Sequence, residues 1–165
     1  MPSPEETTTA RATTAVRADT LPKLAGGHLG ESEWHEITQE QVNLFADATL
    51  DHQWIHTDPD RARSGPFGGP IAHGYLTLSL APALLDEILD IEGVDQVVNY
   101  GLNKVRFPAP VPVGSRVRLV ADCSTVDEVK GGYQATFALT FRAEGVDKPV
   151  CVAEILFRYY TGGSS

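Results

Sequence analysis

Two side chains that exchange protons near neutral pH stand close together in this sequence. Asp51 and His56 are five positions apart, between two stretches with helical patterns. A carboxylate and an imidazole that share one water molecule can divide the roles of general base and general acid. Both residue types are also common in capping and surface positions. The pair on its own is therefore a hypothesis about catalysis.

A glycine at the start of an apolar segment adds a second element. The loop from Phe67 leads directly to Gly74, where a helix is predicted to begin. The first N–H groups of a helix have no partner within it, and the helix dipole is positive there. Since Gly74 has no side chain to block a ligand, its N–H is a candidate donor to a developing oxyanion. Close packing or turn geometry explains a glycine there equally well.

Three predicted helices position these residues. Residues 74–89 are apolar on nearly every face, so this helix must be wrapped by other elements, and Pro82 should kink it. Thr38 to Gln41 has the form of a capping box, which predicts a helix over 39–48. Asp58 followed by Pro59 predicts a short helix that runs to Arg63.

Beyond Gly93 the apolar residues recur with a period of two, which is typical of strands with one buried face. Glycine and proline clusters separate these runs. The pattern predicts about four consecutive antiparallel strands. One apolar helix followed by an antiparallel sheet is an α+β plan, in which the sheet curls round the helix.

The pattern predicts a single domain with flexible ends. Residues 1–26 are rich in Thr, Ala, Pro and charge and should form a flexible N-terminal tail. Residues 27–160 should form the domain, and residues 161–165 a flexible C-terminus. The chain length of 165 residues suits one domain of this kind.

Composition excludes several classes of function. The net charge of −9 opposes binding to nucleic acid. No apolar run approaches the ~20 residues of a membrane helix, so no membrane association is expected. Cys123 and Cys151 have the spacing of neither a zinc site nor a disulfide framework, and His and carboxylate residues show no metal-ligand spacing. We expect free thiols, no metal and a cytoplasmic location.

Two motifs together resemble a known family. The first is Phe45-Ala46-x-x-Thr49-x-Asp51-x-x-x-x-His56-x-Asp58-Pro59, and the second is Gly69-Pro70-Ile71-Ala72-His73-Gly74. They are similar to the motif of MaoC-like proteins, the (R)-specific enoyl-CoA hydratases (hydratase 2). A third similar segment begins at Val105. The sequence from Gln53 to His56 resembles that of the family members similar to nodulation protein N. The resemblance covers residues from about 30 to 158.

This resemblance implies a hot-dog fold, in which a long central helix is wrapped by a curved antiparallel sheet, and a homodimer whose sheets join. It implies that Asp51 and His56 hold a catalytic water and that the Gly74 N–H polarises a thioester carbonyl. Water would then add to a trans-2-enoyl thioester to give the (R)-3-hydroxyacyl thioester, or leave it. The acyl group would be carried by CoA or by an acyl carrier protein, and no cofactor is needed.

The residues expected next to the substrate are Trp54, Pro70, Ile71, Ala72 and His73. Trp54 could border the acyl chain or pack beneath its own loop. His73 is expected to fix the turn before Gly74 by a hydrogen bond. Two other functions remain open: a thioesterase on the same fold, in which an acidic residue activates water against the carbonyl carbon, and a non-catalytic subunit that binds acyl thioesters.

Overall fold

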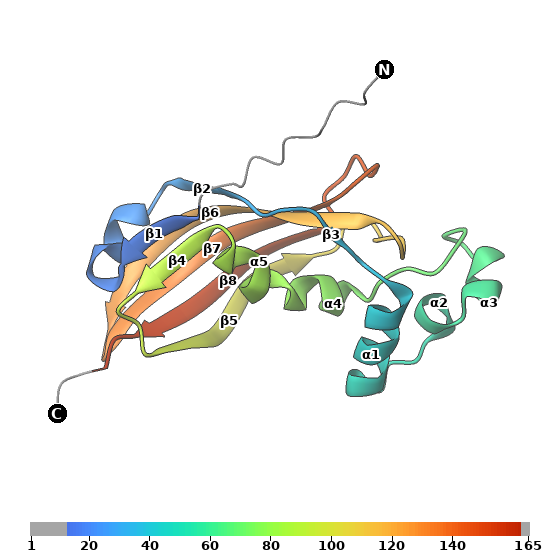
Figure 1. Ribbon diagram of the computed structural model, residues 1–165, viewed down its shortest axis with the longest axis horizontal. Helices are drawn as coiled ribbons and strands as arrows, with labels where there is room; N and C mark the ends of the chain where they lie inside the picture. Colours follow the sequence, from blue (N-terminus) through green and yellow to red (C-terminus); the bar gives the residue numbers. More distant parts are fainter. Residues whose placement is uncertain (1–12, 163–165) are drawn as a thin grey trace, which may run out of the picture.

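The computed structural model describes residues 13–162, which form a curved antiparallel sheet with helices along its concave side (Figure 1). The sheet has the strand order β2-β6-β7-β8-β5, and β3 pairs with β6 beyond the end of β2. The bounds of these strands are β2 (His28–Glu31), β3 (His35–Glu36), β5 (Gln96–Arg106), β6 (Arg116–Val129), β7 (Gly132–Ala143) and β8 (Cys151–Tyr160). The long strands agree with the predicted run of antiparallel strands, so the α+β plan is confirmed.

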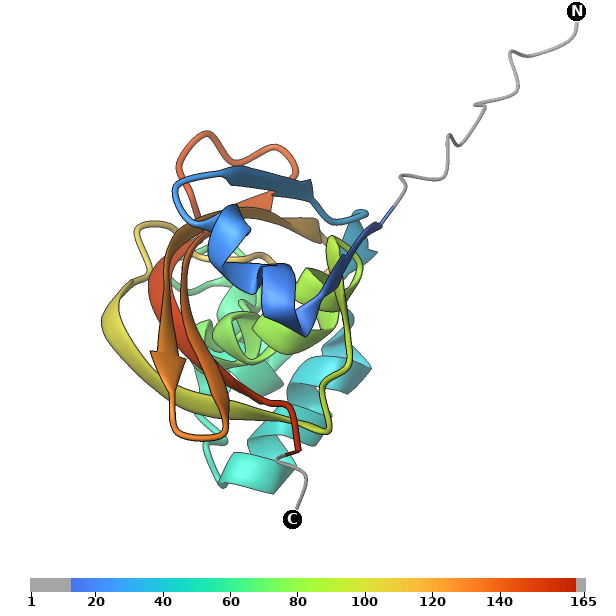
Figure 2. The same ribbon diagram turned by 90° about the vertical axis from the view of Figure 1, so that its left-hand side faces the viewer.

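The helices fall into two groups. The bounds are α1 (Gln39–Thr49), α2 (Trp54–Thr57), α3 (Pro59–Arg63), α4 (Gly74–Ser79) and α5 (Ala81–Asp86). Helices α4 and α5 lie against the sheet, which curves round them, whereas α1 to α3 extend beyond one end of it (Figures 1 and 2). None of the helices in the described part of the chain is long and apolar enough to cross a membrane.

Alternating side chains of the central strands form the core. On β7, the alternating residues Ala135, Phe137, Leu139 and Phe141 are buried in the core. Phe137 is packed against Phe157 and Tyr159 of β8. The period of two in the sequence therefore marked the buried face of β6, β7 and β8 correctly, whereas on β5 the alternating residues Tyr100 and Leu102 are exposed.

The central helix is interrupted, unlike the continuous helix predicted over 74–89. Helix α4 ends at Ser79, and α5 begins at Ala81 with Pro82 in its first turn. Proline lacks an N–H and is best tolerated in the first turn of a helix. The predicted helix is therefore divided at Leu80 into two helices, whereas only a kink was expected. Leu89 is then the first residue of β4 (Leu89–Glu92).

The predicted N-terminal boundary is wrong for residues 14–24. They form strand β1 (Thr14–Arg17), which pairs in parallel with β4, and the 3-10 helix η1 (Ala18–Leu24). Leu21 is fully buried in the core and Val16 and Leu24 pack against it. These apolar residues are diluted by Thr, Ala and charge in the sequence, which hid the anchoring contact. The remainder of the predicted tail, residues 1–12, lies outside the described residues.

Both predicted N-caps are confirmed. The Thr38 hydroxyl accepts a hydrogen bond from the Gln41 N–H at 3.1 Å, and the Asp58 carboxylate accepts one from the Arg61 N–H at 3.0 Å. These caps fix where α1 and α3 begin. They therefore also fix the ends of the segment that carries Asp51 and His56.

Candidate active site

Asp51 lies in the link between α1 and α2. The link begins at Leu50, whose φ of 64° is unusual for a residue other than glycine and turns the chain out of α1. The Asp51 side chain is 54% exposed, and its carboxylate accepts a hydrogen bond from the Gln53 N–H at 3.4 Å. The other carboxylate oxygen, Oδ2, lies 4.0 Å from Nε2 of His73, and the exposed side chain can still meet a water or a ligand.

His56 is buried, and one hydrogen bond fixes its tautomer. It lies in the single turn of α2, and its Nδ1 is 2.6 Å from the carbonyl oxygen of Ile71. A carbonyl only accepts, so Nδ1 carries the proton and Nε2 of the neutral ring has a free lone pair. The sequence did not predict the single turn of α2 that carries His56.

Burial keeps His56 in its neutral form. Desolvation lowers the pKa of His56 from its ordinary value of 6.5, and the nearby His73 ring lowers it further. The Ile71 carbonyl and the Asp51 carboxylate act in the opposite direction but do not cancel the effect of burial. A neutral imidazole with a free Nε2 is a competent general base at pH 7.

His73 connects the two candidate catalytic residues. Its Nε2 donates a hydrogen bond to the backbone carbonyl of Asp51 at 2.9 Å. Its ring is stacked on that of His56, with the centroids 3.9 Å apart and the planes at 24°. The ring of Phe45 of α1 also packs against the His73 ring, with the two centroids 4.9 Å apart. The predicted hydrogen-bonding role of His73 in this turn agrees with these contacts.

Asp51, His56 and His73 form a compact cluster whose geometry favours proton transfer over metal binding. Potential ligand atoms of Asp51, His56 and His73 lie within 4.8 Å of one another. The lone pair of an imidazole nitrogen lies in the ring plane, and stacked rings hold these planes nearly parallel. Zinc needs nitrogens at about 2.0–2.1 Å that converge on one point, which this stacking opposes.

Gly74 is the first residue of α4, so its N–H has no acceptor within the helix. The ring of Phe107 lies directly over it. A Cβ built on Gly74 would be 3.1 Å from three atoms of that ring, which is closer than ordinary packing. The glycine thus allows the close approach of an aromatic ring.

A cavity of about 290 Å³ brings several of these residues together. It is lined by His56, Gly74 and Thr77, by Ile71 and Ala72, and by an apolar wall of residues 107–111, which follow β5, together with Phe67 and Val150. Among the residues predicted to contact substrate, Ile71 and Ala72 line this cavity. Asp51, Trp54, Pro70 and His73 do not.

Trp54 packs beneath its own loop, which was one of the two alternatives left open by the sequence. A Cβ on Gly65 would be 2.9 Å from its ring, and the Arg61 guanidinium lies over it at 4.3 Å. Pro70 has a backbone role as well, because its carbonyl accepts a hydrogen bond from the Val113 N–H. The structure therefore gives no support for substrate contacts by Trp54 or Pro70.

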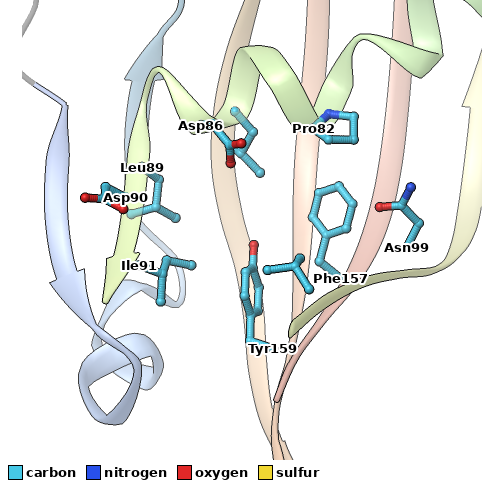
Figure 3. Close-up of a pocket in the computed structure, with 10 residues that line it drawn as sticks. Pro82, Asp86, Leu89, Asp90, Ile91, Asn99, Phe157 and Tyr159 are labelled. Carbon is cyan, nitrogen blue, oxygen red and sulfur yellow. The ribbon is translucent and has the colours of Figure 1, made fainter. Parts of the chain in front are cut away.

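Two further cavities follow the seam between the helices and strands β5 and β8. The nearer one, of about 310 Å³, includes Leu78, Leu102 and Ile155. The farther one, of about 410 Å³, includes Asp86 and Tyr159 and shares Pro82, Asn99 and Phe157 with the nearer one. Figure 3 shows Asp86 of α5 and the hydroxyl of Tyr159 facing the same space. The seam thus runs from the Gly74 end of the helices to the Asp86 end.

Thr77 is a polar residue of this cavity that the sequence prediction missed. It is the polar residue one helical turn after Gly74, on a helix that is otherwise almost entirely apolar. That position on the same helical face was the available signal. The apolar surroundings made it look like an ordinary core residue.

Comparison with known proteins identifies the family of this fold. The family described as "MaoC like domain" matches residues 21–140. The chain is 56% identical over 140 residues to 3-hydroxyacyl-thioester dehydratase Z of Mycobacterium tuberculosis (strain ATCC 25618 / H37Rv), covering 84% of this chain and 93% of that protein. It is 41% identical over 140 residues to nodulation protein N of Rhizobium leguminosarum bv. viciae, covering 81% and 84%.

A solved structure shows the same fold at low identity. The unliganded R-hydratase PhaJ1 from Pseudomonas aeruginosa matches with a TM-score of 0.65 and 21% identity over 81% of this chain and 83% of that one. Its sheet and helices correspond to those described above, which confirms the predicted hot-dog fold.

Proposed function

This chain belongs to the MaoC-like domain family, and from that premise we propose that it is an (R)-specific hydratase or dehydratase of acyl thioesters. It would interconvert a trans-2-enoyl thioester and water with the (R)-3-hydroxyacyl thioester. The name of the M. tuberculosis relative, a 3-hydroxyacyl-thioester dehydratase, supports this reaction class. The acyl group would be carried by CoA or by an acyl carrier protein.

One observation carries the proposal: the His56 Nδ1–H bond to the Ile71 carbonyl leaves Nε2 as a free base beside the Asp51 carboxylate and within the cavity that contains Gly74. A base at this point can take a proton from a water. A backbone N–H on the same cavity can donate a hydrogen bond to a carbonyl oxygen and stabilise the negative charge that develops there. Hydration of a conjugated thioester needs both.

The proposed steps balance without an oxidant or a metal. The water oxygen forms a bond to C3 as the Asp51 and His56 pair takes one of its protons. The double-bond electrons move towards the thioester, so the carbonyl oxygen gains enolate charge next to the Gly74 N–H. The pair then delivers a proton to C2, and the net result is addition of one water. Dehydration is the same sequence in reverse, and no cofactor is proposed.

The acyl chain is proposed to follow the helix–sheet seam. The cavities along it are lined by successive residues of the helices, from Thr77 through Pro82 to Asp86. Their other wall includes Val150, which directly precedes β8, and then Ile155, Phe157 and Tyr159 of that strand. Since the seam starts at Gly74, a thioester carbonyl held there would direct its chain along this line.

A second copy of the chain is the proposed partner. Strand β5 pairs with β8 on one side and is an edge of the sheet on the other. It exposes Val97, Tyr100 and Leu102 at 54%, 53% and 47%. A long apolar edge is prone to pair with another strand. Antiparallel pairing of two β5 strands would join two sheets into a homodimer.

The cytoplasm is the proposed location. Cys123 and Cys151 are free and buried, and desolvation raises the pKa of the Cys151 thiol to about 12. Unpaired cysteines of this kind fit a reducing compartment.

The test is hydration of crotonyl-CoA by the purified protein. Loss of the absorbance of the conjugated double bond is expected, and chiral analysis should give the (R)-3-hydroxy product. Release of free thiol without loss of the double bond would instead identify a thioesterase. Absence of both reactions across enoyl-CoA chain lengths, together with retained acyl-CoA binding, would identify a non-catalytic binding subunit.

A further inference from the structure

The hydroxyl of Thr77 is a buried polar group whose hydrogen-bonding capacity is unused. Thr77 is 1% exposed, and its Oγ1 has no hydrogen-bond partner among the described residues. Most buried hydroxyls in proteins have a partner, because an unpaired one loses its bonds to water without replacement. The oxygen belongs to a side chain that lines the same cavity as His56 and Gly74.

Other hydroxyls on the helices of this protein behave differently. The Ser79 hydroxyl donates to the Tyr75 carbonyl at 2.5 Å, and the Thr49 hydroxyl donates to the Phe45 carbonyl at 2.8 Å. This bond to the carbonyl four residues earlier is the usual partner of a helical Ser or Thr. Thr77 has the same opportunity at His73, but its hydroxyl does not use it.

Backbone hydrogen bonds already occupy the local acceptor. The His73 carbonyl accepts from the Leu76 N–H at 3.0 Å and from the Thr77 N–H at 3.3 Å. Side chains on a helix lean towards its N-terminus, and residues three apart lie on one face. The Thr77 side chain therefore lies over the turn that begins with Gly74.

We propose that the Thr77 hydroxyl donates a hydrogen bond to the thioester carbonyl oxygen of the substrate, as a second donor beside the Gly74 N–H. This inference rests on the proposed function. Charge grows on that oxygen as the enolate forms, so a donor fixed there stabilises the transition state more than the ground state. The hydroxyl carries one proton for donation, and no protein acceptor in the described residues competes for it.

Valine and serine substitutions separate this role from packing. Thr77→Val keeps the shape and removes the hydroxyl, whereas Thr77→Ser keeps the hydroxyl. Since the hydroxyl has no protein partner, its removal should leave the melting temperature unchanged or raise it. A purely structural threonine would give the opposite sign. Thr136→Val makes the same chemical change at a buried threonine of β7, away from the cavity.

The first readout is crotonyl-CoA hydration. Loss of one donor to an oxyanion is expected to lower kcat on the order of 10²-fold in Thr77→Val. Thr77→Ser should keep most of the activity, and Thr136→Val should match the wild type. Wild-type kcat in Thr77→Val would overturn the proposal.

The second readout is binding without turnover. Butyryl-CoA carries the thioester carbonyl, and its thioether analogue S-butyl-CoA lacks it. Thr77→Val should weaken binding of butyryl-CoA and leave that of S-butyl-CoA unchanged. Equal effects on both ligands, or binding of neither by the wild type, would overturn the proposal.

These measurements also separate the two hypotheses. If the wild type hydrates no enoyl-CoA, the proposed function fails, and the two CoA ligands still decide whether Thr77 senses the carbonyl. If Asp51→Asn abolishes hydration but Thr77→Val does not lower it, only the role of Thr77 is rejected.

Discussion

The ring of His73 lies on the ring of His56, with centroids 3.9 Å apart, while its Nε2 donates to the backbone carbonyl of Asp51 at 2.9 Å. One buried side chain thus touches both members of the proposed acid and base pair. Because His73 immediately precedes Gly74, it also ties the pair to the start of α4. The relative positions of base, carboxylate and backbone donor therefore depend on this one residue.

Asp51→Asn and His56→Gln should each lower kcat for crotonyl-CoA hydration by about 10²-fold or more, the contribution of a positioned acid or base. The Asp51 side chain is half exposed, so its replacement should leave the thermal midpoint nearly unchanged. Steady-state kinetics and circular dichroism melting measure the two effects. Normal turnover in either variant would remove that residue from the mechanism.

His73→Phe tests the positioning role. The phenyl ring can keep the stacking on His56 but cannot donate to the Asp51 carbonyl. Loss of that bond is expected to cost about 1–3 kcal/mol of the free energy of unfolding, since the carbonyl is left without its donor. Activity should fall because Asp51 is no longer fixed. Urea unfolding and kinetics check this, and a variant as active and stable as the wild type would contradict it.

The activity should depend on pH through His56. Its pKa is lowered from 6.5, so the neutral, basic form predominates at and above that pH. For hydration, kcat/KM should fall on the acid side with a midpoint below pH 6.5. A profile with its acid midpoint above 6.5 would show that His56 is not the base.

The free energy of unfolding should also depend on pH through His56. The unfolded chain binds a proton at about pH 6.5, whereas the folded chain binds it only at lower pH, so the unfolded state holds more protons in between. The contribution of His56 is therefore fully present above pH 6.5 and is lost as the pH falls towards the folded pKa. Comparing the free energy of unfolding of the wild type with that of His56→Gln at several pH values isolates the contribution of His56. A difference that does not change with pH would contradict it.

Gly74→Ala should disturb Phe107. The added Cβ would lie 3.1 Å from its ring, so the ring must move, and the cavity wall moves with it. Lower activity and a lower melting temperature are expected. The double variant Gly74→Ala with Phe107→Leu should recover stability relative to the single one. Additive losses in the double variant would show that the ring is not the cause.

Leu102→Glu should disrupt the proposed dimer, because it places a charge on the exposed edge strand β5. Leu44→Glu is the matched control, since Leu44 is 62% exposed on α1. Sedimentation velocity should show a monomer for Leu102→Glu and a dimer for both the control and the wild type. Identical sedimentation of all three proteins would reject β5 as the interface.

Much of the fold was accessible from local patterns. The period of two after Gly93 marked the strands, and the caps at Thr38 and Asp58 marked the starts of α1 and α3. These signals are local in physical origin: alternation reflects one buried face, and a cap satisfies N–H groups two or three residues away. The anchoring of Leu21 was missed because it depends on packing against distant elements, whereas Pro82 predicted a kink in the central helix but not its full interruption.

The candidate site also has features that the sequence determined and features that only the tertiary structure determined. The sequence by itself determined which residue types are present and how Asp51, His56 and Gly74 are spaced, and a resemblance gave them roles. Only the tertiary structure decided that the Ile71 carbonyl fixes the tautomer of His56, that His73 stacks on His56, and that Trp54 turns away under its loop. It also decided that the Thr77 hydroxyl has no protein partner. Hydrogen-bond direction and burial are set by groups far apart in the chain, and residue spacing alone carries no information about them.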